Sequence, residues 1–479
     1  MLEAVNQSGN RFLLRNAQLI SGEIVDLRIA GGEIQQLEQG LAEAQGEVVI
    51  SAQGNLLLPG LYDHHLHLFA TAAAQNSVAC GPPNVNNQAE LRSALAQAPG
   101  NDWLRGVGVD DSVCPGLNAR WLDQLQLNRP VRLQHRSGML WVFNSQAMAA
   151  LNLSQPLPEG VELDGSGQPT GRFYNLDAWL GQRIPKRPAD LTALSQALAR
   201  FGITHLTDAG VNNNSETFSA LSLAQSRGEL RQKLLIMGQP SLATASLPVS
   251  SKIGLGPEKI YLREVNLPEL EQLVARIDAA HRQQRPVAFH CVTLVEIHFA
   301  VAALAQTQCI LNDRIEHASV ADDYVLQQMA TLGVTAVSQP QFIYERGDRY
   351  LKEVASEDLL NLYRGRSFTQ AGVAFAAGSD APYGSIDPWL AMRAAVNRRT
   401  RAGEELQGNE ALTPLAALNL FGGDFMHPGG QLRALAAGQP ADLVLMKAPW
   451  QSIEKNLASD QVALTFCDGN IIYADSQWA

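Results

Sequence analysis

Short apolar runs alternate with helix-like segments along the middle of this 479-residue chain. The segment LPELEQLVARIDAAHRQQ (267–284) indicates a helix, and it stands before the strand-like run PVAFHC (286–291). Such alternation is typical of βα units that build a parallel sheet. Strand candidates occur in order at 56–63, 203–208, 233–238, 259–263, 286–291, 313–317, 333–338 and 373–379. Eight consecutive units predict an α/β fold, a (β/α)8 TIM barrel, over residues 56–429.

Both ends of the chain are rich in strand patterns instead. The first 55 residues contain RFLLRNAQLI, IVDLRIAGGEI and EVVISAQGNLLL, with a hairpin-like turn at AGGE. The far end repeats the pattern in ADLVLM (441–446) and ALTFCDGNIIYAD (463–475). We therefore expect residues 1–55 and 430–479 to form one composite β-sandwich domain.

Residues 70–195 do not fit the count of eight strands. They contain two further strand-like runs, DWLRGVGV and PVRLQHRS, and several Pro/Gly turns. We interpret this segment as an insertion after barrel strand 1 that covers the barrel mouth.

Metal-ligating residue types follow the predicted strands. Active sites of such barrels lie at the C-terminal strand ends. In LLLPGLYDHHLHL (56–68), residues i and i+2 of the strand face the same way, so His65 and His67 can bind one ion, whereas His64 faces away. Each histidine alone has an ordinary structural explanation. The joint placement of His65, His67, Lys259, His290, His317 and Asp380 on one rim predicts a divalent metal site, for which zinc is suited.

Five segments, LLLPGLYDHHLHL, VAFHCVT, DRIEHAS, AAGSDAPYG and GQPADLVLM, resemble the amidohydrolase superfamily. More narrowly, they resemble its amidohydrolase-3 group, which includes YtcJ-like and N-substituted formamide deformylase-like proteins. The resemblance covers nearly the whole chain and implies metal-dependent hydrolysis of C–N bonds in amides, formamides or cyclic amides. It also implies ligand roles: His65, His67 and Asp380 for the more buried metal, His290 and His317 for a second, and a carboxylated Lys259 as the bridge.

Lys259 stands early in its predicted strand, and the alternative is a salt-bridged surface lysine, which would leave a single-metal site.

A metal lowers the pKa of bound water, from about 16 to about 7 with zinc, and polarises a carbonyl. Asp380 can take the proton of the water and pass it to the leaving nitrogen. With one metal only, His290 or His317 would polarise the carbonyl. The structural alternative for Asp380 is the N-cap of the helix after strand 8.

The insertion departs from the family pattern in two places. The segment HRSGMLWVFNS has Gly138-Met139 where relatives often have Gly-His, and GRFYN lacks the glutamate that relatives carry. Both segments are substrate-pocket elements in the family, so the substrates of relatives are not carried over. The substrate-binding candidates are Trp141, Asn144, Arg172 and Tyr174 in the insertion and Gln339 and Tyr383 after strands 7 and 8, each with a packing or surface role as the alternative.

Charge and cysteine usage limit the classes of partner and the cellular compartment that we expect. The formal net charge is −11 and no long Lys/Arg block occurs, which argues against nucleic acid and anionic membranes. No apolar run reaches 18 residues, and no secretory signal pattern opens the chain. Five scattered cysteines indicate reduced thiols and a cytoplasmic protein. We expect a small-molecule substrate, and a homo-oligomer stays open.

Three functions are compatible with these residues. The first is a metal-dependent hydrolase of a non-peptide C–N bond. The second is a single-metal deaminase on the same scaffold, which a functional Lys259 bridge would disfavour. The third is a catalytically silent regulatory or binding protein, against which the complete set of expected ligands speaks.

Overall fold

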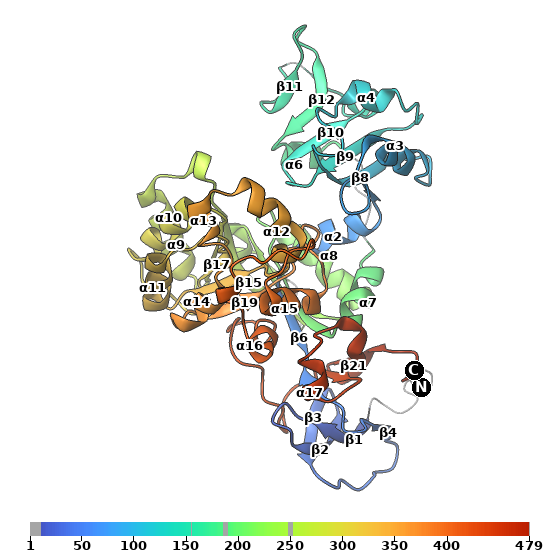
Figure 1. Cartoon of the computed structure of the whole chain (residues 1–479), viewed down its shortest axis with the longest axis vertical. Coiled ribbons are helices and arrows are strands. Elements are labelled where there is room, and N and C mark those ends of the chain that lie inside the picture. Colours follow the sequence, from blue (N-terminus) through green and yellow to red (C-terminus); the bar gives the residue numbers. More distant parts are fainter. Residues whose placement is uncertain (1–10, 155, 185–189, 248–251, 479) are drawn as a thin grey trace. The chain divides into compact units, whose positions relative to one another are not determined.

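The computed structural model describes residues 11–154, 156–184, 190–247 and 252–478 (Figure 1). The chain divides into two compact units, one within residues 1–68 and 191–479 and the other within 69–190. The first unit holds a parallel eight-stranded sheet and two four-stranded sheets, and the second holds a six-stranded sheet. None of the helices in the described ranges is long and apolar enough to cross a bilayer.

The eight-stranded sheet is the predicted barrel. Its strands run in the spatial order β19-β18-β17-β16-β15-β14-β13-β6, and every neighbouring pair is parallel. Two backbone hydrogen bonds join the open edges, from Asp380 N to His65 O (2.7 Å) and from His67 N to Ala381 O (2.9 Å). The strands are β6 Leu61–Leu66, β13 Ile203–Asp208, β14 Lys233–Gly238, β15 Ile253–Tyr261, β16 Val287–Cys291, β17 Arg314–His317, β18 Thr335–Ser338 and β19 Phe375–Ala377.

Helices separate most of these strands along the chain and lie around the sheet (Figure 1). Many begin at a capping side chain; Thr293 and Glu296, for example, form a reciprocal capping box at the start of α10. The helices of this unit from α7 on are α7 Thr192–Arg200, α8 Ser215–Ser226, α9 Leu270–His281, α10 Leu294–Leu304, α11 Asp323–Leu332, α12 Gln341–Glu353, α13 Ser356–Leu359, α14 Gly365–Gln370, α15 Pro388–Asn397, α16 Pro414–Asn419 and α17 Trp450–Ile453, with short 3-10 turns η1 Pro240–Thr244, η2 Glu264–Asn266, η3 Gly408–Glu410 and η4 Ser459–Gln461.

Two predicted strands have wrong bounds. The run 56–63 is split at Gly60: β5 (Leu57–Pro59) pairs with β20 of the sandwich, and only the part from Leu61 on joins the barrel. A Cβ at Gly60 would lie 2.1 Å from Thr204 Oγ1, so the close approach of β13 requires glycine there. The fourth strand begins at Ile253 instead of 259, and Lys259 therefore lies near its end, not early in it.

Strands from both chain ends form a sandwich of two sheets, with orders β3-β2-β1-β4 and β22-β21-β20-β5. One core joins them, and the rings of Phe12 and Phe466 meet edge to face with centroids 5.4 Å apart. Apolar residues that alternate along each strand fill this core, as expected for packed sheets. The strands are β1 Phe12–Gln18, β2 Ile24–Ala30, β3 Glu33–Glu38, β4 Val48–Ser51, β20 Leu443–Met446, β21 Val462–Cys467 and β22 Asn470–Ala474.

The second unit is built on a mixed sheet with the order β11-β12-β10-β9-β8-β7. The two runs predicted there are present as β8 and β9. Alternation along the strands gives two apolar clusters, one around Leu133 and Val142 and the other around Trp141 and Phe173. The elements are β7 Val78–Ala79, β8 Leu104–Val109, β9 Val131–His135, β10 Leu140–Phe143, β11 Val161–Leu163, β12 Pro169–Tyr174, α3 Gln88–Ala96, α4 Ala119–Asp123, α5 Ser145–Ala150 and α6 Asp177–Gly181, and α2 Leu68–Gln75 leads into the unit.

Candidate metal centre

Three predicted ligands lie together at the C-terminal rim of the barrel. The ligand atoms of His65, His67 and Asp380 are all within 4.8 Å of one another. The Nε2 atoms of the two histidines lie 3.5 and 3.4 Å from Asp380 Oδ1. The His-x-His spacing works as expected, because residues 65 and 67 at the end of β6 face one side while the buried His64 bonds Gly422 O (3.0 Å) on the other.

The protonation of Asp380 suits a ligand. Burial alone would raise the pKa of this carboxyl, but the hydrogen bonds from His65 and His67 outweigh it and hold the pKa well below its usual value. An ionised carboxylate is the form that binds a cation. Asp380 also has a positive φ of 49°, and His317 has 70°. Left-handed backbone of this kind persists only where the surroundings fix it, and it is concentrated at functional sites.

An ion pair behind His65 fixes its ring. His65 Nδ1 makes a very short contact to Glu316 Oε2, and Arg314 Nε lies 2.5 Å from Glu316 Oε1. Both charged side chains are fully buried. Burial would raise the pKa of Glu316, but Arg314, Lys259 and His65 outweigh it and hold the pKa well below its usual range. A carboxylate bonded to Nδ1 leaves Nε2 for a ligand, which is the usual arrangement around metal-binding histidines.

His290 and His317 continue the row of imidazoles. Ring centroids of His65 and His317 are 4.9 Å apart, and those of His317 and His290 are 4.4 Å apart. Burial lowers the pKa of both histidines, that of His317 to about 3, so both are neutral at pH 7, as metal ligands must be. His317 Nδ1 lies 2.8 Å from Gln339 Oε1, which orients the ring.

Lys259 is buried, with 3% of its surface exposed, and it is not the surface residue of the alternative prediction. Within the described ranges its Nζ has no hydrogen-bond partner. Burial lowers its pKa to about 8, although the carboxylates of Glu316 and Asp380 oppose the shift. An unpaired buried amine is costly, so this position is suited to a group that binds the nitrogen.

The segment after β19 is held tightly against β6. Asp63 Oδ1 accepts hydrogen bonds from Ser379 N (2.9 Å) and His65 N (3.1 Å). Gln341 Nε2 donates to the carbonyls of Gly378 (3.1 Å) and Ser379 (2.8 Å). A Cβ at Gly378 would lie 2.4 Å from His65 N, so only glycine allows this approach. These contacts set Asp380 opposite the two histidines.

The substrate-binding candidates fall into two groups. Gln339 contacts His317, and the ring of Tyr383 lies 5.9 Å from that of His67. The other four, Trp141, Asn144, Arg172 and Tyr174, lie in the second unit. There Trp141 donates to Asp177 (2.9 Å), Asn144 caps α5, and Arg172 bonds the Tyr174 hydroxyl. Their contact with a substrate stays a prediction.

Sequence reasoning missed Glu316, Arg314, Asp63 and Gln341. One signal was available: Arg314 and Glu316 are charged at i and i+2 in a strand that must be buried on both faces, so they share an inward face. No such signal marks Asp63 or Gln341, because their roles depend on backbone groups distant in sequence.

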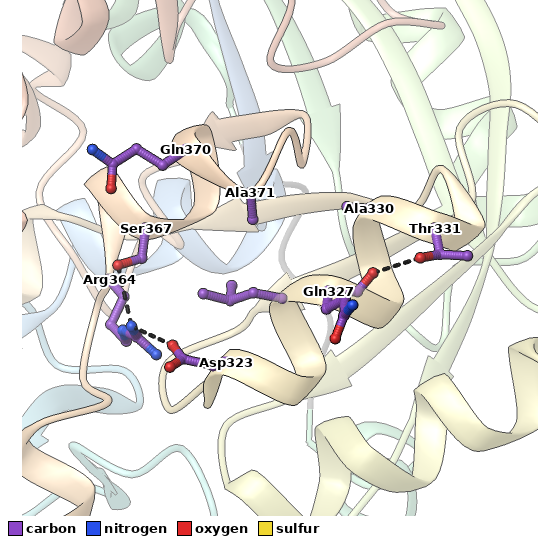
Figure 2. A pocket seen from close by; sticks show the side chains of 9 residues that line it. Asp323, Gln327, Ala330, Thr331, Arg364, Ser367, Gln370 and Ala371 are labelled. Carbon is purple, nitrogen blue, oxygen red and sulfur yellow. Dashed lines mark hydrogen bonds and ion pairs between the residues drawn. The ribbon is translucent and has the colours of Figure 1, made fainter.

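A surface groove of about 540 Å³ lies elsewhere, between α11 and α14 (Figure 2). Its one guanidinium, that of Arg364, is paired with Asp323 (2.7 Å) and Glu410 (3.3 Å) and bonds Ser367 (3.2 Å). The groove therefore offers no unmatched charge to a ligand.

We expect Glu316→Gln to lower both stability and metal affinity. The neutral side chain leaves the Arg314 charge buried and unmatched, which costs about 3–5 kcal/mol in comparable pairs. Loss of a carboxylate that orients a ligand weakens metal binding about 10–100-fold. Because the folded-state pKa of Glu316 is depressed, its stabilisation is present above its unfolded pKa of about 4.3 and is lost as pH falls.

Urea unfolding at pH 7 and pH 3 measures this effect, and the difference between wild type and variant should be smaller at pH 3. Glu353→Gln is the matched control, because Glu353 pairs with Arg349 on the surface and both side chains are about half exposed. A surface pair contributes about 0–1 kcal/mol. Equal losses of unfolding free energy in the two variants would show that the buried Arg314–Glu316 pair does not stabilise the site.

A family model described as "Amidohydrolase family" matches residues 48–473. The chain belongs to the amidohydrolase family. This match confirms the predicted resemblance. Members of the family are hydrolases, which confirms the predicted enzyme class. The parallel eight-stranded sheet confirms the predicted barrel. The N-substituted formamide deformylase of Arthrobacter pascens is 26% identical, over 93% of this chain and 94% of the relative. The YtcJ protein of Bacillus subtilis (strain 168) is 23% identical, over 93% and 94%.

Solved structures show the same fold. An uncharacterized metal-dependent hydrolase from Pyrococcus furiosus superposes on this amidohydrolase with a TM-score of 0.72 at 20% identity, over 90% of this chain and 98% of the other.

Proposed function

We propose that this amidohydrolase is a metal-dependent enzyme that hydrolyses a non-peptide C–N bond, in an amide, formamide or cyclic amide, of a small molecule. One observation carries the proposal: His65, His67 and Asp380 converge within 4.8 Å at the rim where barrel enzymes place their sites. The relatives' names, one of them a formamide deformylase, support the same bond type.

The donor set fits zinc. Two imidazoles and one carboxylate are a common protein ligand set for that ion and leave a position open. A second ion would be held by His290 and His317, with a carboxylated Lys259 between the two, and the buried Nζ without a described partner supports this arrangement. A bound divalent metal supplies Lewis acidity toward a carbonyl and makes water a better nucleophile.

The residues of the chain supply orientation and proton transfer. Asp380 accepts the proton of the attacking water on a carboxylate oxygen and returns it to the leaving nitrogen. Glu316 and Gln339 keep the rings of His65 and His317 in the required tautomers. Trp141, Asn144, Arg172 and Tyr174, in the second unit, stay the proposed substrate-binding residues of the insertion. The five free cysteines support a reducing, cytoplasmic location.

Product analysis tests the proposal. Protein loaded with zinc is incubated with N-acyl amino acids, formamides, hydantoins and cyclic ureas, and products are followed by mass spectrometry. We expect a carboxylate and an amine, or a ring-opened acid, from at least one class. Ammonia released from an amidine-type compound alone would support the single-metal deaminase instead. The burial of Lys259 speaks against that alternative. If none of the four compound classes is turned over, the proposal is contradicted.

A further inference from the structure

Tyr261 is an inward-facing residue of the barrel mouth. It is the last residue of β15 and stands two positions after Lys259, so both side chains lie on the same face of the strand. Lys259 is buried, but Tyr261 is 46% exposed. Its register partner is His290, and the two ring centroids are 4.2 Å apart at an interplanar angle of 33°. The ring therefore lies against the candidate site with much of its surface open.

Tyr261 is the outer end of the row of rings. His290 contacts His317, and His317 contacts His65, with centroids 4.4 and 4.9 Å apart. A molecule held at the His65 cluster and extending along this row reaches the exposed Tyr261 ring. An aromatic face favours a second aromatic ring, in an offset-stacked or edge-to-face arrangement. A cationic group would also bind a ring face, but the divalent metal that the proposed function places at this row of histidines would oppose it.

Hydrogen bonds hold together the two loops that flank Tyr261. Glu296 Oε1 accepts a hydrogen bond from Glu264 N (3.0 Å), and its Oε2 accepts from Val292 N (2.7 Å) and Thr293 N (3.1 Å). One carboxylate thus ties the loop after β15 to the loop after β16. These loops also expose Val265 (84%) and Val292 (40%), which extends the apolar surface outward.

We infer that Tyr261 determines specificity, and that the substrate carries an aromatic or other flat apolar group beside the bond that is hydrolysed. This inference rests on the proposed function, since the metal centre fixes the reacting end of the molecule. The ordered loops lower the entropic cost of binding such a group.

Two hydroxamates test the inference by binding, without turnover. Benzohydroxamate and acetohydroxamate share a metal-chelating head and differ in a phenyl against a methyl group. Calorimetry on zinc-loaded protein is expected to give tighter binding of benzohydroxamate. In Tyr261→Ala its advantage should fall by about 2- to 12-fold, the usual contribution of an aromatic pair, whereas Tyr261→Phe should keep it.

Tyr324→Ala is the matched control. Tyr324 is also a half-exposed tyrosine stacked on a histidine, His298, with centroids 5.6 Å apart, but that histidine belongs to α10 and not to the row. We expect the ratio of the affinities for benzohydroxamate and acetohydroxamate in Tyr324→Ala to equal that of the wild type. If neither hydroxamate binds any variant, the proposed metal centre is wrong. If both bind and Tyr261→Ala leaves their ratio unchanged, the metal centre stands and the specificity inference is overturned.

Discussion

Asp380→Asn is expected to lower turnover by about 10²–10⁴-fold at saturating metal, which is roughly 3–5 kcal/mol of transition-state stabilisation. The amide keeps the size of the side chain and one ligand oxygen, so metal binding weakens without disappearing. It cannot take up the proton of the attacking water, and the general-base contribution is lost. Rate, metal content and melting temperature measured on one purified variant separate these effects.

The structure also decides the alternative role of Asp380. The prediction that it caps the helix after strand 8 is wrong, because α15 begins at Pro388 and its N-cap is Asp387, whose carboxylate accepts a hydrogen bond from Trp389 N (2.9 Å). Asp387→Asn is therefore the control, in the same segment and with the same chemical change. It should cost at most about 1 kcal/mol of stability and keep turnover near the wild-type value. A similar, small loss of turnover in both variants would remove the proton-transfer role from Asp380.

Replacing His65 and His67 together by alanine is expected to remove the more buried metal and all detectable turnover. Loss of a group that only orients a ligand weakens metal affinity about 10–100-fold, and loss of two ligands exceeds this. The fold should persist, because Glu316 keeps its ion pair with Arg314 when His65 is absent. Elemental analysis and circular dichroism measure the two properties.

His427→Ala serves as the control for this pair. His427 lies on the surface beside Asp424, at 3.0 Å, and its side chain is more than half exposed. Its replacement should leave metal content and turnover unchanged. Full metal content in the His65/His67 double variant would place the ion elsewhere.

The order of the barrel strands could be predicted because most of them are short apolar runs followed by a helix. Their bounds could not, for local reasons. LLLPGLY is one continuous apolar run, but β5 pairs with β20 and β6 pairs with β13, strands that are distant in sequence. The start of β15 contains Gly254, Gly256 and Pro257, which normally interrupt strands, so the sequence places its beginning six residues late.

Part of the candidate site could likewise be predicted from the sequence, and part could not. The spacing of His65 and His67 predicts a shared face, and the strand ends predict a shared rim. Glu316, by contrast, matters because it lies between a guanidinium and an imidazole that are brought together by three-dimensional packing. Tyr261 shares a face with Lys259 in the predicted strand as well, but the predicted end at 263 hides that Tyr261 is the last residue of β15 and lies at the mouth.

Titration of metal-free protein with zinc tests the central claim most directly. The protein is stripped with a chelator, zinc is added in steps, and the hydrolysis rate of a substrate found in the product screen is recorded with the bound zinc per chain. We predict that the rate is negligible without metal, rises with bound zinc and levels off when the His65, His67 and Asp380 site is filled. Full turnover by the stripped protein, or a rate that does not follow bound zinc, would contradict the account.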